Sequence, residues 1–296
     1  ALGVPVVELP YTVEGSTGAA GAVDAFGLAM SLSLGWGPPG VDVATDYGYQ
    51  QAAPWWTLSR RDRVYSDGSG STDNHRTMAA TLLGFGTSPA ALEAVDDELL
   101  DVREYLWSLS APAWPLPVDP AAERGAEVYA EAGCAECHGE PCAPFPDRVV
   151  PVDEVGTDPT RALAFGPTEA AWVNGSWFGA PAPMTSTGGY LAPALDGVWA
   201  SAPYLHNGTV PDLWGVLDSG ARPAVWVRTG TSLADYDPER GGWRYEEVAA
   251  PVDRSTPEAR RVVDTSVPGL SSAGHTYGDA LDDADRAALV AWLVTR

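Results

Sequence analysis

The sequence predicts a mainly α, loop-rich fold, because turn-forming residues are frequent and the clear periodic segments are short. Gly (32) and Pro (26) are numerous among the 296 residues and favour turns and short helices. Together they are about a fifth of the chain, below the roughly 25–30% that marks low-complexity disorder. Hydrophobic residues contribute 45% and charged residues 19%, so the chain can bury a core.

Capping residues and apolar stripes mark three helices. The first opens at Ser88-Pro89, and its stripe consists of Leu92, Val95, Leu99, Val102, Leu106 and Leu109. The second begins at Asp119-Pro120 and carries Ala122, Gly125, Tyr129 and Ala132 on one face. The last has Asp282, Asp283 and Asp285 in its first turn and an apolar stripe of Leu289, Trp292 and Leu293. Between residues 139 and 254 we expect little helix except around residues 211–217.

The charge balance excludes several functions. Acidic residues number 40 and basic residues 17, all of them Arg, for a net charge of −23. A chain without Lys cannot use a lysine Schiff base or a P-loop lysine. Strong acidity argues against nucleic acid and anionic membrane surfaces as partners. No segment predicts a membrane span, and the sequence begins like a mature or trimmed chain.

The cysteines point to a metal cofactor. Cys134-Ala-Glu-Cys137-His138 has the form C-x-x-C-H, the attachment signature of a c-type haem. Each thiol can add to one vinyl group of the porphyrin, and the adjacent His can ligate the iron. The alternatives are a redox C-x-x-C, which lacks the expected βαβ context, and half of a zinc site, which lacks a second pair of ligands. The motif therefore predicts one covalent haem c and leaves Cys142 as a free thiol.

Two further patterns resemble known families. Gly125 and Tyr129 before the motif, with Trp292 and Leu293 in the last helix, resemble the helix pair of the cytochrome c fold. Residues 190–213 resemble a motif of the rubber-oxygenase-like cytochromes, which are relatives of the bacterial dihaem cytochrome c peroxidases. Shorter matches are Trp55-Trp56, Val155–Pro159, Arg222-Pro223, Tyr236–Pro238 and Gly274–Gly278.

The resemblance covers roughly residues 50–296 and implies a domain division. We expect a cytochrome c domain over residues 116–296 with a long insertion at 140–270. Residues 1–115 form an N-terminal extension that lacks a haem motif and can be read as a degenerate cytochrome domain. Many relatives carry two haem sites, whereas this chain has a single C-x-x-C-H.

The second axial position of the iron separates electron transfer from oxygen or peroxide chemistry. The resemblance implies a distal ligand at His275, in Gly-His-Thr-Tyr-Gly. Met184 is the alternative, because it follows Pro-Ala-Pro and lies 46 positions after His138. The resemblance gives His206 a hydrogen-bonding role in the haem pocket, and we expect His75 in a solvated loop.

The remaining candidates surround the haem. Trp199 and Tyr204 can line it or simply pack in the core. Arg161 and Arg222 are candidates for pairing with haem propionates, with surface ion pairs as the alternative. The loop that begins at Tyr236 could bind calcium, as in peroxidase relatives, or be a solvated acidic loop.

These observations favour electron transfer by one haem c with His138 and His275 as ligands. Haem c is attached outside the cytoplasm in bacteria, so we expect a periplasmic or cell-surface location. The acidic surface indicates a redox partner with a basic face. An oxygenase or peroxidase with an open iron, and a subunit of a larger cytochrome assembly, are the alternatives.

Overall fold

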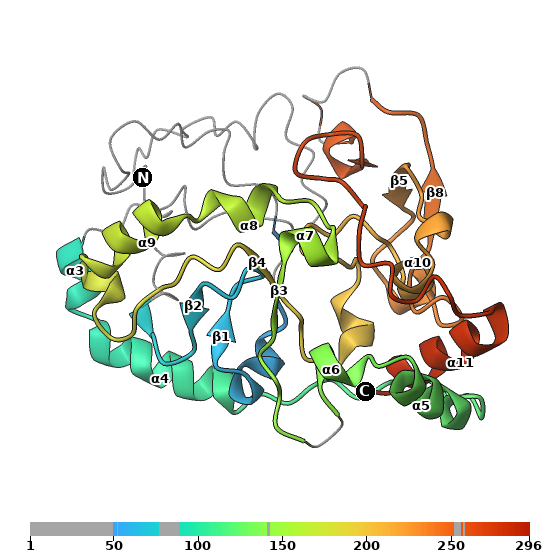
Figure 1. The fold of residues 1–296 in the computed structure, drawn as a ribbon, viewed down its shortest axis with the longest axis horizontal. Helices are drawn as coiled ribbons and strands as arrows, with labels where there is room; N and C mark the ends of the chain where they lie inside the picture. Colours follow the sequence, from blue (N-terminus) through green and yellow to red (C-terminus); the bar gives the residue numbers. More distant parts are fainter. Residues whose placement is uncertain (1–49, 52, 77–88, 141–142, 252–255, 257) are drawn as a thin grey trace.

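A computed structural model describes residues 50–51, 53–76, 89–140, 143–251, 256 and 258–296. This part of the chain consists of short helices and small sheets joined by long loops (Figure 1). The α-helices are α3 (Pro89–Glu93), α4 (Asp96–Trp107), α5 (Ala122–Glu131), α6 (Ala135–His138), α7 (Val152–Val155), α8 (Thr160–Ala164), α9 (Pro167–Asn174), α10 (Leu213–Leu217) and α11 (Asp283–Leu293). Short 3-10 helices lie between them, including η1 (Trp55–Arg60), η3 (Val198–Ser201) and η4 (Ser219–Ala221).

The sheets are small and antiparallel. Their strands are β1 (Arg63–Val64), β2 (Gly70–Ser71), β3 (Val149–Pro151), β4 (Gly189–Leu191), β5 (Val225–Arg228), β6 (Tyr236–Asp237), β7 (Gly242–Trp243), β8 (Tyr245–Glu247) and β9 (Val263–Asp264). Strands pair as β1–β2, β3–β4 and β6–β7, and β5 lies between β8 and β9. Opposite Val150 in β3 lies Tyr190 in β4, so the chain just after α6 runs beside the start of the 190–213 motif.

The helix expected from residue 89 is interrupted. It forms α3 and α4, which meet at Val95, where the backbone leaves helical geometry (φ −117°, ψ 22°). Leu92, Leu99 and Leu106 are buried, whereas Val95 and Val102 are 36% and 44% exposed. Residues seven apart lie on one narrow side of a helix, so only that side faces the core. The expected stripe was therefore too wide, and Ser88 lies outside the described residues.

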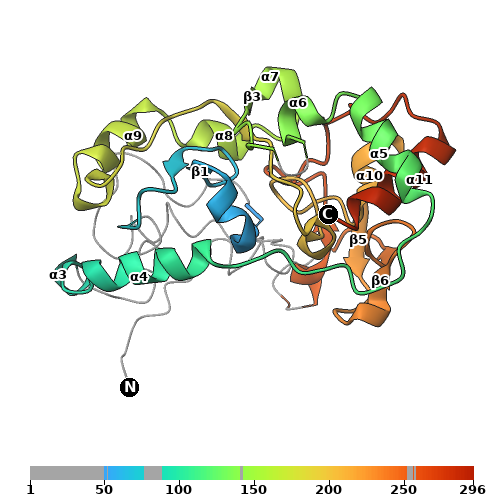
Figure 2. The same ribbon diagram turned by 90° about the horizontal axis from the view of Figure 1, so that it is seen from below.

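Two helices far apart in the sequence pack at one end of the molecule. In Figures 1 and 2, α5 and α11 lie side by side, opposite the end that holds α3, α4 and α9. Gly125 allows the close approach, since a Cβ there would lie 2.0 Å from the carbonyl oxygen of Ala288. Beside it the rings of Tyr129 and Trp292 are 4.5 Å apart. This contact is the one that the sequence led us to expect.

Asp283 and Asp285 lie in the first turn of α11 as expected, whereas Asp282 precedes that turn as the N-cap. The Asp282 side chain accepts a hydrogen bond from the backbone N–H of Asp285, and Asp283 adds negative charge to the first turn.

The buried side chains form two main clusters. The first joins α5, α11, α10 and η3, and consists of Ala122, Val128, Tyr129, Val198, Ala202, Tyr204, Val210, Leu213, Leu217, Leu289, Val290, Trp292, Leu293 and Val294. The second joins α3, α4 and α9, and consists of Leu92, Leu99, Phe165, Ala170, Val173, Phe178 and Met184. Cys134 and Ala135 pack against the first cluster, so the C-x-x-C-H segment belongs to the α5–α11 end.

Helices α8 and α9 correct the expectation of little helix between residues 139 and 254. Pro167 opens α9 at a position where its missing N–H costs nothing. The Glu169 carboxylate accepts a hydrogen bond from the N–H of Gly166 and so caps the same end. Pro167 and Glu169 are recognisable in the sequence as the start of a helix, but the many turn-forming residues around them led us to expect loops.

The described residues contain no helix that is long and apolar enough to cross a membrane.

We expect Gly125→Ala to lower the free energy of unfolding by about 1–3 kcal/mol, because the added methyl group must force α5 and α11 apart. Urea denaturation followed by tryptophan fluorescence measures this loss. Gly175→Ala is the control, since a Cβ there would meet its nearest atom at an ordinary 3.5 Å. Equal stability of the two variants would show that the helices do not depend on this contact.

Candidate haem-binding site

The C-x-x-C-H segment forms a tight corner after α5. The N–H of Cys134 donates to the carbonyl oxygen of Tyr129 at 3.2 Å, which turns the chain directly into α6. The Tyr129 hydroxyl then donates to the carbonyl oxygen of Gly139 at 2.7 Å. Gly139 has φ +76°, a conformation that suits glycine. One tyrosine therefore fixes both ends of the motif, a role that sequence reasoning did not assign to it.

The two thiols of the motif are not activated for redox exchange. Cys134 and Cys137 are half-buried and free. Burial raises the pKa of both thiols, and the nearby Arg148 only partly offsets this for Cys137. A dithiol exchange site needs a stabilised thiolate, so the redox C-x-x-C alternative has no support from these surroundings.

His138 is held by one ring nitrogen. Its Nδ1 lies 2.8 Å from the carbonyl oxygen of Pro193, just after β4. Such a contact fixes the orientation of a metal-ligating imidazole and leaves Nε2 for the metal. Burial lowers the pKa of His138, which favours the neutral form that can ligate. Nothing in the sequence indicated that the carbonyl oxygen of Pro193 would orient the His138 ring.

His275 faces His138. The two ring centres are 6.2 Å apart and the ring planes meet at 63°. A metal lies about 2 Å from an imidazole nitrogen, which lies about 1.1 Å from the ring centre, so two imidazoles on opposite sides of one ion have centres about 6 Å apart. Nδ1 of His275 is buried and has no hydrogen-bond partner. The pair therefore fits a single iron with one imidazole on each side.

The electrostatic surroundings keep His275 neutral. Burial, together with the nearby His138 and Arg222, lowers the pKa of His275 to about 4. The ring also meets Tyr277 edge to face at 5.2 Å. Tyr277 is 53% exposed, and its pKa is raised by burial and by the nearby Glu154 and Cys137. This tyrosine therefore marks where the site reaches the surface.

Met184 lies in a different part of the molecule. Its side chain is 2% exposed and belongs to the second core cluster, with Phe178 and Leu92. Asn174 holds its backbone on both sides, accepting from its N–H at 2.8 Å and donating to its carbonyl oxygen at 2.9 Å. The structure thus brings His275 to His138 and gives Met184 a packing position.

Trp199 and Tyr204 both belong to the α5–α11 end. Trp199 donates from Nε1 to the carbonyl oxygen of Pro112 at 2.9 Å. The Tyr204 hydroxyl donates to the carbonyl oxygen of Gly241 at 2.9 Å. Tyr204 lies in the first core cluster, and Trp199 packs against it. Cys134 packs against the same cluster, so both aromatic side chains belong to the part of the core that carries the C-x-x-C-H motif.

His206 takes part in a separate buried polar group. Its ring stacks on Tyr190 with centres 3.9 Å apart, and its Nε2 is buried without a hydrogen-bond partner. Burial lowers the pKa of His206 to about 3, and the positive charge of Arg161 acts in the same direction. Arg161 itself pairs with Asp67 at 3.2 Å, and the two side chains are only 4% and 2% exposed.

Arg222 is bonded to backbone carbonyl oxygens, including those of Gly274 and His275 at 2.7 and 3.1 Å. The structure therefore shows protein partners for both Arg161 and Arg222, and their pairing with haem propionates stays a prediction. His75, expected in a solvated loop, is buried and contacts Asp96 through Nε2 at 2.9 Å. Asp96 is the first residue of α4, directly after the break at Val95, and nothing in the sequence indicated that it would contact His75.

The two remaining candidates are the loop considered for calcium and Cys142. Asp237, in the loop considered for calcium, accepts hydrogen bonds from the N–H groups of Glu239 and Arg240 and lies near Arg244. Among the described residues there is no group of three or more His, Cys, Asp or Glu side chains that could hold an ion. Cys142 lies outside the described residues.

Comparison with known proteins relates the chain to cytochromes. Residues 189–227 match a family model described as "RoxA-like, cytochrome c-like". This segment contains β4 and Pro193, whose carbonyl oxygen contacts His138. The match supports a cytochrome c-like relation and a haem-binding protein.

Two relatives come from Sinorhizobium fredii (strain NBRC 101917 / NGR234). "Uncharacterized protein y4iM" is 27% identical over 255 residues, which are 77% of this chain and 57% of that protein. "Uncharacterized protein y4iJ" is 35% identical over 117 residues, which are 36% of this chain and 17% of that protein. The chain therefore spans little more than half the length of one relative and a smaller part of the other.

We expect Arg161→Met to lower the free energy of unfolding by roughly 3–5 kcal/mol, because it leaves the Asp67 carboxylate buried without its cation. Thermal and urea unfolding measure the loss. The double variant Arg161→Met/Asp67→Asn should recover much of it, since both charges are then removed. If Arg161→Met instead changes the haem spectrum at unchanged stability, Arg161 contacts the haem.

Proposed function

We propose that this protein is an electron-transfer cytochrome with one haem c, attached through Cys134 and Cys137 and ligated by His138 and His275. The observation that carries the proposal is the facing pair of imidazoles beside a C-x-x-C-H motif, with ring centres 6.2 Å apart. Residues 116–296 would form the cytochrome c domain, with residues 140–270 inserted. The packing of α5 against α11 at Gly125 supports this division.

Some residues of the chain would attach the haem, and others would orient the histidine ligands. When bound, the haem supplies the one-electron iron couple. The two cysteines tie it to α6, and Pro193 orients the His138 ring through Nδ1. His275 would supply the second ligand. Two protein ligands would leave no place for oxygen or peroxide at the metal, which favours electron transfer over oxygen chemistry.

The electron would enter or leave near Tyr277, where the site reaches the surface. Around it lie Glu136 and Glu154, whose side chains are 78% and 49% exposed, with Arg148 bridging toward both at 4.0 and 3.0 Å. This face and the net charge of −23 suit a partner with a basic face. Covalent haem attachment implies a periplasmic or cell-surface location. Docking to a further cytochrome would use the same face.

We expect the oxidised wild-type protein to show a low-spin bis-imidazole spectrum and, once reduced, to bind no carbon monoxide. His275→Ala removes one ligand, so the iron becomes high-spin and binds carbon monoxide. Absorption and electron paramagnetic resonance spectra report both properties.

Met184→Leu is the matched control and should keep the wild-type spectrum, because it changes only core packing. A wild-type protein with a five-coordinate iron would contradict the proposal and favour the oxygenase or peroxidase alternative. Loss of the low-spin signal in Met184→Leu but not in His275→Ala would assign the axial position to Met184.

We expect the rate of electron transfer to a small basic cytochrome c to fall about tenfold or more as the salt concentration rises from about 10 to 200 mM, because salt screens the attraction between opposite charges. Stopped-flow absorbance measures the rate. The same partner with succinylated lysines is the control and should react slowly at all salt concentrations. A faster reaction with the succinylated partner would contradict an acidic docking face.

A further inference from the structure

We infer that Arg222 is the residue that positions His275 for the iron, by binding the backbone of the loop that carries it. This inference rests on the proposed function, because it assigns a role to Arg222 only if His275 is an axial ligand. It replaces the propionate role that the sequence led us to expect for Arg222.

One side of the guanidinium holds the His275 loop. Nη1 donates to the carbonyl oxygens of Ser272 and Gly274, the latter at 2.7 Å. Nη2 donates to the carbonyl oxygen of His275 itself at 3.1 Å. Three carbonyl groups within four residues are therefore fixed by one side chain.

The other side of the guanidinium holds α10. Nε donates to the carbonyl oxygen of Gly215 at 2.7 Å, and Nη2 reaches that of Val216 at 3.4 Å. The last carbonyl groups of a helix have no partner within the helix, so they are free to accept. Arg222 thus links α10, which packs in the first core cluster, to the ligand loop.

The hydrogen-bond count explains why an arginine is needed. A guanidinium carries five N–H donors, and the contacts with Gly215, Val216, Ser272, Gly274 and His275 supply five acceptors. No donor remains for a haem propionate. A lysine would keep the positive charge but offers three donors on a single nitrogen, which cannot reach both sides.

The backbone of the loop requires such support. His275 has φ +46°, in the left-handed region that a residue with a side chain adopts only at a cost. Gly274, at φ +75°, is pressed onto Gly156, where a Cβ would lie 2.2 Å from the carbonyl carbon. The N–H of His275 donates to the carbonyl oxygen of Val155 at 2.8 Å. The loop is therefore held from α7 on one side and by Arg222 on the other.

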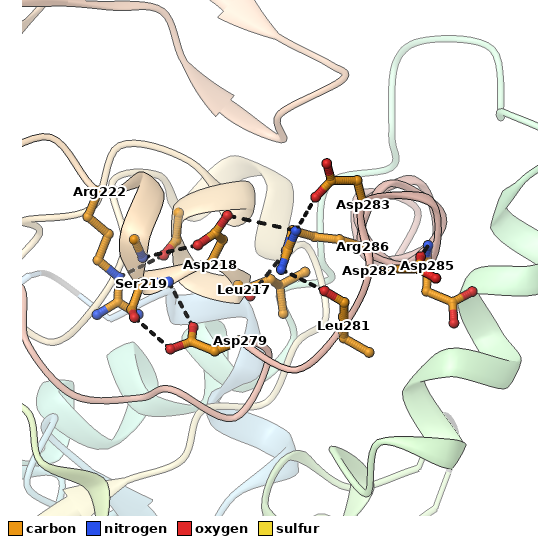
Figure 3. A network of polar contacts seen from close by, with 12 residues as sticks. Leu217, Asp218, Ser219, Arg222, Asp279, Leu281, Asp282, Asp283, Asp285 and Arg286 are labelled. Carbon is orange, nitrogen blue, oxygen red and sulfur yellow. Dashed lines mark hydrogen bonds and ion pairs between the residues drawn. The ribbon is translucent and has the colours of Figure 1, made fainter.

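A second arginine offers a matched comparison. Figure 3 shows Arg286 reaching from α11 to the same region, beyond Ser219 and Asp279. Arg286 donates to the carbonyl oxygens of Leu217 at 3.3 Å and Leu281 at 2.8 Å. Like Arg222 it bonds carbonyl oxygens, but it is buried and also pairs with Asp283 at 2.6 Å, and none of these contacts is to the residues from Ser272 to His275. It can stabilise the fold without setting the ligand.

The experiment compares Arg222→Gln, Arg222→Lys and Arg286→Gln as haem-loaded proteins. We expect both Arg222 variants to lose part of the low-spin signal and to bind carbon monoxide when reduced. If about 10% of the protein has a detached His275, its apparent affinity for carbon monoxide is about a tenth of that of His275→Ala, in which the position is always open. Arg286→Gln should unfold at a lower temperature yet keep the wild-type spectrum and remain inert to carbon monoxide.

Each other outcome is decisive. An Arg222→Gln protein with the wild-type spectrum and no carbon monoxide binding overturns the inference. A wild-type-like Arg222→Lys protein overturns it as well, because a single ammonium group would then replace the five donors of the guanidinium. If neither Arg222 variant accumulates while Arg286→Gln does, Arg222 has a general folding role and the inference is wrong. Failure of the proposed function is distinguished separately, because the wild-type protein would then bind carbon monoxide itself or His275→Ala would keep the low-spin spectrum.

Discussion

The proposed haem site depends on holding two imidazoles, from His138 and His275, with their centres 6.2 Å apart although they are far apart in the sequence. A small displacement of either ring would put it out of reach of a shared metal, so both must be carried by rigid backbone. On one side, the corner between α5 and α6 is fixed by Tyr129 and backed by the contact at Gly125. On the other, hydrogen bonds to Val155 and from Arg222 hold the backbone of the His275 loop. The His138 side is therefore held mainly by the packing of α5, and the His275 side is held mainly by hydrogen bonds to its backbone.

The absence of lysine gives the arginines a particular use. Arg161 neutralises a buried carboxylate, while Arg222 and Arg286 collect carbonyl groups that short helices leave unpaired. In a loop-rich chain many such carbonyls must be satisfied, and a planar fork with five donors does this better than an ammonium group. Arg161 and Arg286 are buried, whereas the side chain of Arg148 is 40% exposed and lies between Glu136 and Glu154 at the face near Tyr277. The two carboxylates at that face outnumber its single arginine.

Local signals in the sequence predicted part of this arrangement. The C-x-x-C-H motif, the helix with Gly125 and Tyr129, and the acidic first turn of the last helix each depend on neighbouring residues, so spacing alone reveals them. The break at Val95 and the helix α9 were not predicted. The apolar spacing runs through Val95 without interruption, and the signal at Pro167 and Glu169 stands among many turn-forming residues. The partners of Arg222 could not be predicted at all. They are backbone carbonyls, which every residue carries, and only the fold determines which of them meet a given side chain.

The same reasoning bears on the choice between His275 and Met184 as the axial ligand. Met184 is 2% exposed among Leu92, Phe178 and their neighbours, and Asn174 fixes its backbone from both sides. Withdrawing it to reach a metal would leave a cavity, at a cost of about 2–5 kcal/mol by analogy with truncation of a buried Met, and would break two hydrogen bonds. His275 needs no such movement, because its ring centre already lies 6.2 Å from that of His138. The energetic balance therefore favours histidine, even though a methionine flanked by prolines is a reasonable candidate from the sequence.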